Sequence, residues 1–517
     1  MESVVINGES LSLEEIIAVA RRGAHVNLTP RVKEQVEQGR KVVQEILESG
    51  KVVYGINTGF GELARVKIPT NETGILQENM ILSHSAGVGP PLDPEIVKAT
   101  MLLQVNSIAK GHTGARIVIC QTLMDMLNNG VVPIVPAKGS IGASGDLAPL
   151  AHIVSVMLGH GGARVDDGAC VNGKTAMDRV KIPIIRLEAM EGLALINGTH
   201  MMTAIGSLAL YDVENLVKAA EIASMMSLEA LKGTDTAFEE RIHALRPHPG
   251  QLACAENLRK LTQASENLQS HKEYVPDAHE IIQDSYSLRC IPQVHGAIRD
   301  AISYVKRVIK TELNSVTCNP LIFPESSVKV SLGGNFHGQP VALALDVLGI
   351  TITELGNISE RRINRLLDAH LSNGLPPFLT EKAGTHSGYM LAQYIAAALV
   401  SENKVLATPA SVDSIPVSAN TEDYVCMGMH AAMKARTIIE NTMCIIAIEL
   451  LCAAQALDFR APLRFGRGTQ KAYEVIRHEI SHLEEDRETY RDIKKLVEMI
   501  RSGTIVRLVE DIVGQLN

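Results

Sequence analysis

The sequence predicts a mainly α-helical protein, in which a loop-rich, mostly helical N-terminal domain precedes an elongated helical bundle. Three observations favour this fold class. Long stretches repeat their apolar residues at helical spacing. The 517 residues include no tryptophan and only 7 phenylalanines, which argues against an aromatic-rich β-sandwich. Finally, 46% of the residues are hydrophobic, which is enough to bury large cores.

The N-terminal domain is expected to span residues 1–190. Glycines close its first two helical patterns, at Gly23 and Gly50, and the Gly- and Asn-rich stretch 52–63 that follows predicts a loop. Residues 159–185 are charged and Gly-rich, and they predict a hairpin or surface excursion. The predicted helices of this domain cover residues 12–23, 30–50, 74–86 and 94–129.

The bundle domain is expected over residues 191–517. Two of its charge-free segments, 192–211 and 383–401, reach the length of a membrane span. Polar side chains interrupt both segments, so we expect helices that are fully surrounded by a large core, and no membrane partner. The predicted long helices cover residues 193–232, 294–315, 338–368, 388–406, 425–457 and 470–500.

Charge and cysteine usage exclude several classes of function. The formal net charge is -9, and no long Lys/Arg run could follow a phosphate backbone, so we expect no nucleic-acid partner. The amino terminus lacks the basic start and apolar core of a signal peptide. The 8 cysteines form no CxxC pair, which indicates neither a disulfide framework nor a zinc ribbon. A reducing cytoplasm is therefore the expected location.

One short pattern imitates a metal site. His478, Glu479 and His482 fit the His-Glu-x-x-His pattern of zinc peptidases, in which two histidines lie one helical turn apart. The surrounding stretch is dense in charges and is typical of a solvated helix face, and no third ligand is suggested nearby. We therefore expect no metal.

The most informative segment is the Gly-rich loop Gly139–Asp146. Such a loop before a helix could bind phosphate, but no Gly-Lys-Ser/Thr closes it, and its spacing differs from a dinucleotide loop and from a nucleophile elbow. Taken alone, a loop of this composition is most often a plain structural turn.

Together with its continuation Leu147–His152, the loop resembles the family of ammonia-lyases and aminomutases that includes the histidine, phenylalanine and tyrosine ammonia-lyases. Six further segments match this family in order: Tyr54–Gly61, Ser83–Gly87, Asn197–Thr199, Gln283–Arg289, Gly333–His337 and Ser418–Asp423. In the family, the glycine nitrogen attacks the alanine carbonyl and two waters are lost, which gives a methylidene-imidazolone (MIO) ring. The resemblance implies that Ala143, Ser144 and Gly145 form this group here, with no external cofactor.

The residue types suit that chemistry. Gly145 has no side chain to obstruct its backbone nitrogen, and Ser144 can lose its hydroxyl to become an exocyclic methylene. The product is an electrophile, which protein side chains do not otherwise supply, and an amino group that adds to it becomes a better leaving group.

The resemblance also implies roles for other residues. Tyr54 would be the base that removes the β-proton, which requires a phenol pKa lowered from about 10 by positive charge or hydrogen bonds. Arg289 would clamp the substrate carboxylate and is our candidate for lowering that pKa. Asn197 would lie near the carboxylate and the ring, and Phe336 beside the ring. Gln283 and Tyr286 match other lining positions of the pocket.

The predicted substrate is L-histidine, which would give urocanate. By resemblance, His84 and Glu422 line the side-chain end of the pocket, where an imidazole finds polar partners and a phenyl ring leaves them unmatched. Met390 also follows the histidine type. Taken singly, His84 could be a satisfied core histidine and Glu422 a helix-capping acid.

Other outcomes stay open. The family pattern is broken at four positions: Thr421, Tyr424, His295 and Cys318. A tyrosine or phenylalanine ammonia-lyase and an aminomutase are therefore alternatives, and a helical scaffold without MIO is the non-enzymatic one. The resemblance further implies a homotetramer whose active sites take residues from several chains.

Overall fold

The computed structural model describes residues 2–165, 168–268 and 283–517 and divides into two compact units. Unit 1 comprises Met1–Leu208, Lys306–Asp346 and Pro409–Met433, and unit 2 comprises the remaining three segments, Ala209–Val305, Val347–Thr408 and Lys434–Asn517. The sequence suggested one boundary near residue 190, whereas unit 1 extends to Leu208 and takes in two later segments. The chain passes from one unit to the other at five points. Four of these points lie inside continuous helices, where no Gly/Pro or composition signal marks a boundary.

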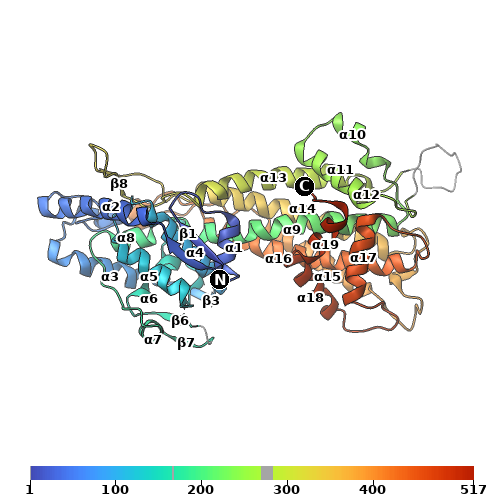
Figure 1. Cartoon of the computed structure of the whole chain (residues 1–517), viewed down its shortest axis with the longest axis horizontal. Coiled ribbons are helices and arrows are strands. Elements are labelled where there is room, and N and C mark those ends of the chain that lie inside the picture. The colour runs from blue at the N-terminus through green and yellow to red at the C-terminus, as the bar shows by residue number, and fades with distance from the viewer. Residues whose placement is uncertain (1, 166–167, 269–282) are drawn as a thin grey trace. The chain divides into compact units, whose positions relative to one another are not determined.

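Unit 1 opens with short strands and helices (Figure 1). Ser12 and Glu15 form a capping box at the first helix, and the second begins at Pro30 and ends at Gly50 with φ 67°. In chain order the elements are β1 (Ser3–Ile6), α1 (Leu13–Ala20), β2 (His25–Leu28), α2 (Pro30–Ser49), η1 (Gly61–Arg65), η2 (Thr70–Glu72), α3 (Thr73–His84), β3 (Val88–Pro91), α4 (Pro94–Ala109) and α5 (Ile117–Asn128).

The rest of the N-terminal region carries the Gly-rich loop. The predicted hairpin within 159–185 is present as the antiparallel pair β6–β7, which is joined to β4. The predicted helix over 94–129 is wrong in one respect, because Gly111 and Gly114 have φ of 80° and 72° and separate α4 from α5. The elements are β4 (Val132–Pro133), β5 (Pro136–Lys138), α6 (Ala148–Met157), β6 (Gly162–Arg164), β7 (Cys170–Asn172), α7 (Gly173–Arg179) and α8 (Glu191–Ile196).

Long helices make up most of the remaining chain, which confirms the mainly α fold class. The predicted helix over 470–500 is two helices, because the chain turns extended at Ile480 with φ -135°. The elements are α9 (His200–Ala230), η3 (Thr236–Phe238), α10 (Glu240–Ala244), α11 (Pro249–Leu261), α12 (Tyr286–Arg289), α13 (Ile291–Glu312), β8 (Leu321–Ile322), β9 (Val330–Ser331), α14 (Gln339–Leu367), η4 (Pro377–Leu379), α15 (Met390–Leu406), η5 (Ser418–Asn420), α16 (Gly428–Asp458), α17 (Arg467–Glu479), α18 (Tyr490–Arg501) and α19 (Thr504–Val513).

The apolar segments differ in their burial. By length and composition α14 and α16 could each cross a membrane, but 72% and 78% of their apolar windows are buried inside the protein, as in core helices. The charge-free segment 192–211 is also buried almost throughout. The expectation of full burial is wrong for 383–401, because α15 exposes Leu391, Tyr394 and Ile395, which are 50%, 57% and 41% exposed in the single chain.

Candidate active site

The Ala143–Gly145 loop lies between β5 and α6 in a strained conformation. Ser144 and Leu147 have φ of 51° and 48°, in the left-handed region that costs a residue with a side chain about 1–2 kcal/mol. Gly142 and Gly145, with φ of 82° and 87°, occupy the same region without that cost. Surrounding contacts must therefore hold the loop in this shape.

Backbone contacts with Gly198 supply part of this support. The Asp146 amide donates to the Gly198 carbonyl at 2.8 Å, and the Gly198 amide donates to the Ser144 carbonyl at 3.1 Å. A Cβ on Gly145 would lie 2.2 Å from the Gly198 oxygen, so no other residue fits there. On the other side, Ala143 packs in a small apolar cluster with Val425. The close approach fits a tripeptide whose third member must be glycine.

Asp146 ties the loop to the start of α9. One oxygen of its carboxylate accepts a hydrogen bond from the Met201 amide at 2.6 Å. The side chain is completely buried, and this burial raises the pKa of the carboxyl to about 7. Sequence reasoning did not select Asp146, although an acid directly after the tripeptide and before an apolar run is a visible signal.

Glu422 reaches the same loop from a distant part of the chain. The Ser144 hydroxyl donates to a Glu422 carboxylate oxygen at 3.2 Å. The preceding turn η5 is left-handed at three consecutive residues, Ser418, Ala419 and Asn420, with φ of 51°, 51° and 65°. The structure therefore brings together two of the residues that the sequence predicted to share a site.

Tyr54 lies in the turn between α2 and η1. Its ring meets the Phe60 ring edge-on, with centroids 6.4 Å apart. Burial raises the pKa of the phenol, the Glu422 charge raises it further, and a backbone hydrogen bond with Gly61 lowers it. The direction is opposite to the lowered pKa expected for a base. The reason is the burial of the phenol, which is the largest of these effects.

The other predicted residues of unit 1 lie at or near the ends of helices. Asn197 is 3% exposed, directly precedes Gly198, and donates from its side chain to the Asn319 carbonyl at 3.0 Å. His84 ends α3, and its Nδ1 lies 2.8 Å from the Met80 carbonyl, which orients the ring. Phe336 lies half-buried in the loop before α14.

Unit 2 contains the other four predicted residues. Tyr286 and Arg289 belong to α12, and the guanidinium of Arg289 lies over the Tyr286 ring at 4.7 Å from its centroid. Tyr286 is 71% exposed. Gln283 lies exposed just before α12, and Met390 is the first residue of α15.

The aromatic amino acid lyase family matches residues 11–478 of the chain. The chain belongs to this family. The expected family is thereby confirmed, and the match covers the strained loop, Glu422 and every other predicted site residue.

Two relatives of this aromatic amino acid lyase are similar over their full length. The histidine ammonia-lyase of Caldanaerobacter subterraneus is 51% identical over 511 residues, and that of Alkaliphilus oremlandii is 52% identical over 511 residues, with 99% of each chain covered in both cases. Among solved structures, histidine ammonia-lyase from Trypanosoma cruzi has a TM-score of 0.91 at 40% identity and covers 98% of this chain and 95% of its own. Tyrosine aminomutase from Streptomyces globisporus has a TM-score of 0.94 at 36% identity, with 100% of both chains covered.

Three of the four departures from the family pattern lie in unit 1. The Thr421 hydroxyl donates to Glu62 at 3.2 Å and so links the Glu422 turn to η1. Tyr424 stacks on His337, with ring centroids 5.9 Å apart. Cys318 is buried, and its thiol lies 3.7 Å from the Pro320 carbonyl. Glu62 and His337 were not selected as site residues from the sequence.

The fourth departure, His295, lies in a buried group of unit 2. With Glu221 and Cys254 it forms a group whose potential ligand atoms lie within 4.8 Å of one another. Both Glu221 oxygens accept hydrogen bonds from Arg299, at 2.7 and 2.8 Å, and one also accepts from Asn257 at 2.8 Å. The carboxylate is thus engaged in an ion pair, and the neighbouring guanidinium opposes the binding of a cation.

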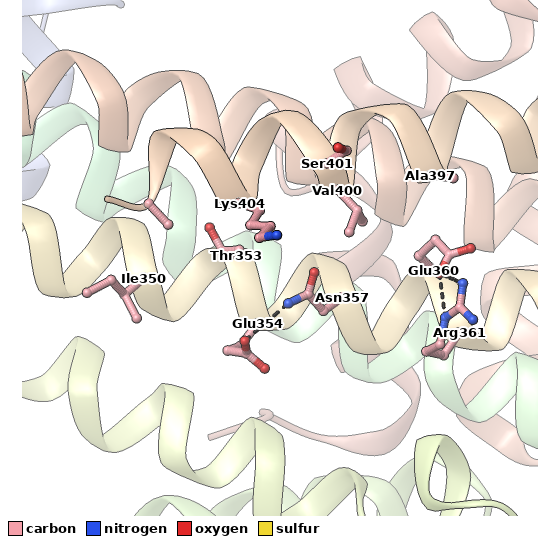
Figure 2. Close-up of a pocket in the computed structure, with 11 residues that line it drawn as sticks. Ile350, Thr353, Glu354, Asn357, Glu360, Arg361, Ala397, Val400, Ser401 and Lys404 are labelled. Atoms are coloured by element: carbon pink, nitrogen blue, oxygen red, sulfur yellow. Dashed lines mark hydrogen bonds and ion pairs between the residues drawn. The ribbon is translucent and has the colours of Figure 1, made fainter. Parts of the chain in front are cut away.

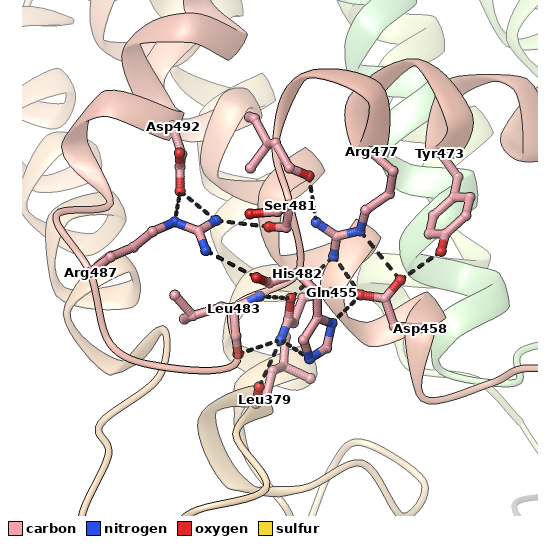
Figure 3. Close-up of polar contacts among 11 residues, drawn as sticks. Leu379, Gln455, Asp458, Tyr473, Arg477, Ser481, His482, Leu483, Arg487 and Asp492 are labelled. Carbon is pink, nitrogen blue, oxygen red and sulfur yellow. Dashed lines mark hydrogen bonds and ion pairs between the residues drawn. The ribbon is translucent and has the colours of Figure 1, made fainter.

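The His-Glu-x-x-His pattern is not a helical ligand pair. Helix α17 ends at Glu479, so His478 is exposed on the helix and His482 lies in the loop beyond it. His482 Nδ1 lies 2.5 Å from an Asp458 oxygen, within a polar network shown in Figure 3. The expected solvated helix face is therefore wrong for His482, whose ring has a structural partner.

A hollow of about 400 Å³ lies in unit 2 between α14 and α15 (Figure 2). Asn357 donates to Glu354 at 3.1 Å on its floor, and Glu360 pairs with Arg361 at one end. Its lining includes none of the site residues predicted from the sequence.

Proposed function

We propose that this aromatic amino acid lyase eliminates ammonia from L-histidine and releases urocanate, using an MIO group formed from Ala143, Ser144 and Gly145 without an external cofactor. The observation that carries the proposal is the 3.2 Å hydrogen bond from the Ser144 hydroxyl to Glu422. It joins the residue that would become the electrophile to the acid expected to recognise an imidazole. The histidine ammonia-lyase relatives support the same substrate.

The open loop is suited to cyclisation. The two backbone bonds that hold it use the Ser144 carbonyl and the Asp146 amide, so neither consumes the Gly145 nitrogen or the Ala143 carbonyl. The left-handed conformation at Ser144 and Gly145 bends the chain tightly between the reacting atoms. Once formed, the group supplies an electrophile that turns the α-amino group into a leaving group.

Tyr54 would remove the β-proton, and its raised pKa means that it needs a cation to do so near neutral pH. We propose that Arg289 supplies this cation and also binds the substrate carboxylate, with Gln283, Tyr286 and Met390 lining the pocket. Within unit 1, Asn197 and Phe336 would border the group. In a homotetramer with shared sites, residues of different chains would meet around one loop.

The exposed face of α15 supports assembly. Leu391, Tyr394 and Ile395 are three exposed apolar side chains at helical spacing, on a helix that the sequence pattern predicts to be core. Apolar side chains of this size gain roughly 25 cal/mol per Å² when another surface covers them. A second copy of the chain is the occupant that the homotetramer proposal names.

His84 and Glu422 would recognise the substrate ring. An imidazole offers a donor and an acceptor to these two side chains, whereas a phenyl ring would leave them without partners in a closed pocket. A tyrosine aminomutase or lyase is the second candidate, because the tyrosine aminomutase structure has the TM-score of 0.94 and a phenol also presents a polar atom.

The test is turnover of single amino acids by the purified protein. We expect ammonia and urocanate from histidine, with kcat/KM well above those for tyrosine and phenylalanine. Preferential turnover of tyrosine, or formation of a β-amino acid, would reject histidine elimination in favour of the second candidate. We also propose a cytoplasmic location, in keeping with eight free cysteines.

A further inference from the structure

A carboxylate from the C-terminal part of the chain binds the turn that precedes α15. One oxygen of Asp486 accepts from the Ser387 amide at 2.8 Å, and the other accepts from the Gly388 amide at 3.0 Å. Hydrogen bonds to a charged acceptor are stronger than those to a neutral one. The two amides lie directly before Tyr389 and Met390, so the bonds fix the start of the helix.

The turn is closely packed around this contact. Gly388 has φ of 56°, and a Cβ there would lie 2.4 Å from the Phe378 oxygen. The Tyr389 amide donates to the same Phe378 carbonyl at 3.0 Å, and its side chain is 1% exposed. The Met390 amide closes the turn by donating to the Ser387 carbonyl at 3.2 Å.

A second acidic residue strengthens the contact. Glu485 pairs with the imidazole of His386 at 2.5 Å and with the ammonium of Lys382. Both partners lie in the segment that leads into the turn. Two consecutive acids, Glu485 and Asp486, therefore bind one short segment through side-chain and backbone groups.

The acids are themselves held in a fixed loop. Arg487 donates to the Ser481 and His482 carbonyls at 2.8 and 3.0 Å, and His482 lies against Asp458 (Figure 3). Asp458 also accepts from Arg477 at 2.7 Å. The polar network in Figure 3 thus anchors the loop from which Asp486 extends.

Glu485 and Asp486 together form a clamp on the turn before α15. They follow residue 478, where the family match ends, and lie in a chain that the two histidine ammonia-lyase relatives cover to 99%. The geometry points to Asp486 as a positioning residue of the substrate site: by binding the Ser387 and Gly388 amides it fixes the backbone of Met390. This inference rests on the proposed function, which gives Met390 its place against the substrate.

The test compares three variants of the full-length enzyme. Asp486→Ala removes both acceptors, Asp486→Asn keeps one, and Glu488→Ala is the matched control, because Glu488 is exposed and pairs only with exposed Arg491 among its described ion-pair partners. We expect Asp486→Ala to raise KM for histidine about fivefold with kcat within about twofold, since lost substrate positioning acts on binding. The KM of Asp486→Asn should lie between those of wild type and Asp486→Ala, and the KM and kcat of Glu488→Ala should match those of wild type.

Amide hydrogen exchange gives the second readout. Residues 387 and 388 should exchange roughly tenfold faster in Asp486→Ala and remain unchanged in the control. Faster exchange with an unchanged KM would overturn the positioning role, because the clamp would then be structural only. Unchanged exchange would overturn the clamp itself. A wild-type enzyme that forms no urocanate would instead reject the proposed function, which separates the two failures.

Discussion

Replacing Glu422 by glutamine keeps the shape of the side chain and removes its charge. The carboxylate faces the Ser144 hydroxyl at 3.2 Å, and its charge contributes to the raised pKa of Tyr54. In the matured enzyme Ser144 has lost its hydroxyl, so the bond at stake is the one from the substrate imidazole to Glu422. A hydrogen bond to a charged group contributes about 1.5–3 kcal/mol. At about 1.4 kcal/mol per factor of ten, Glu422→Gln should lower kcat/KM for histidine roughly 10- to 150-fold.

The same substitution should move the pH profile. Removing a negative charge near the phenol makes the phenolate of Tyr54 easier to form, so its pKa falls. A base acts when deprotonated, so the rising limb of kcat/KM should shift to lower pH in the variant. Phenylalanine, which has no polar ring atom, should lose little of its turnover.

The assay is initial-rate kinetics between pH 6 and pH 10 with histidine and phenylalanine, on protein whose intact mass shows that the loop has matured. Glu62→Gln is the matched control, because it removes an exposed carboxylate that contacts the neighbouring Thr421. An equal loss of kcat/KM for histidine and phenylalanine would refute the role given to Glu422. A rising limb of the pH profile that does not shift would refute it as well.

Three other substitutions have defined outcomes. Gly145→Ala should abolish both maturation and turnover, because the added Cβ would lie 2.2 Å from the Gly198 oxygen at a φ of 87°. Intact mass would detect residual maturation, and a urocanate assay would detect residual turnover. The second substitution is made in a Ser144→Ala background. Burial raises the pKa of Asp146 from 3.8 to about 7, so the folded protein keeps a proton that the unfolded chain releases. The contribution of Asp146 to stability is therefore present at low pH and is lost as the pH rises through 7. Between pH 5 and pH 8 the free energy of unfolding of this background should fall by roughly 2–3 kcal/mol because of Asp146, and adding Asp146→Asn should abolish this fall in denaturant unfolding. Identical pH slopes in the two proteins would contradict the assignment. Ile395→Asp should lower the assembly's molar mass in light scattering, and an unchanged mass would exclude α15 from an interface.

The sequence was most informative where the chemistry needs particular residue types. The Ala143–Gly145 loop and Glu422 were both predicted through the resemblance to the lyase family, because each has an ordinary structural interpretation when taken alone. Asp146 was missed as a site residue, since its role depends on the amide of Met201, 55 residues later in the chain. The pKa of Tyr54 was predicted in the wrong direction because the sequence does not show that the phenol is buried, and burial is the main reason that its pKa is raised.

Other features depend on where helices end. His478 and His482 have the spacing of a ligand pair, but α17 ends between them, so the two residues do not lie on one helix. The charge-free composition of α15 was interpreted as burial in a core, whereas in the single chain its apolar side chains are exposed. Composition predicts that a helix must be covered, but it does not identify the surface that covers it.

The most direct measurement is the mass of the purified, folded protein, followed by fragmentation of the peptide that contains residues 143–145. Loss of two water molecules relative to the translated sequence, confined to these residues and abolished by Ser144→Ala, is the predicted result. A full-mass, linear Ala-Ser-Gly peptide in protein that nevertheless releases ammonia from histidine would contradict the mechanism.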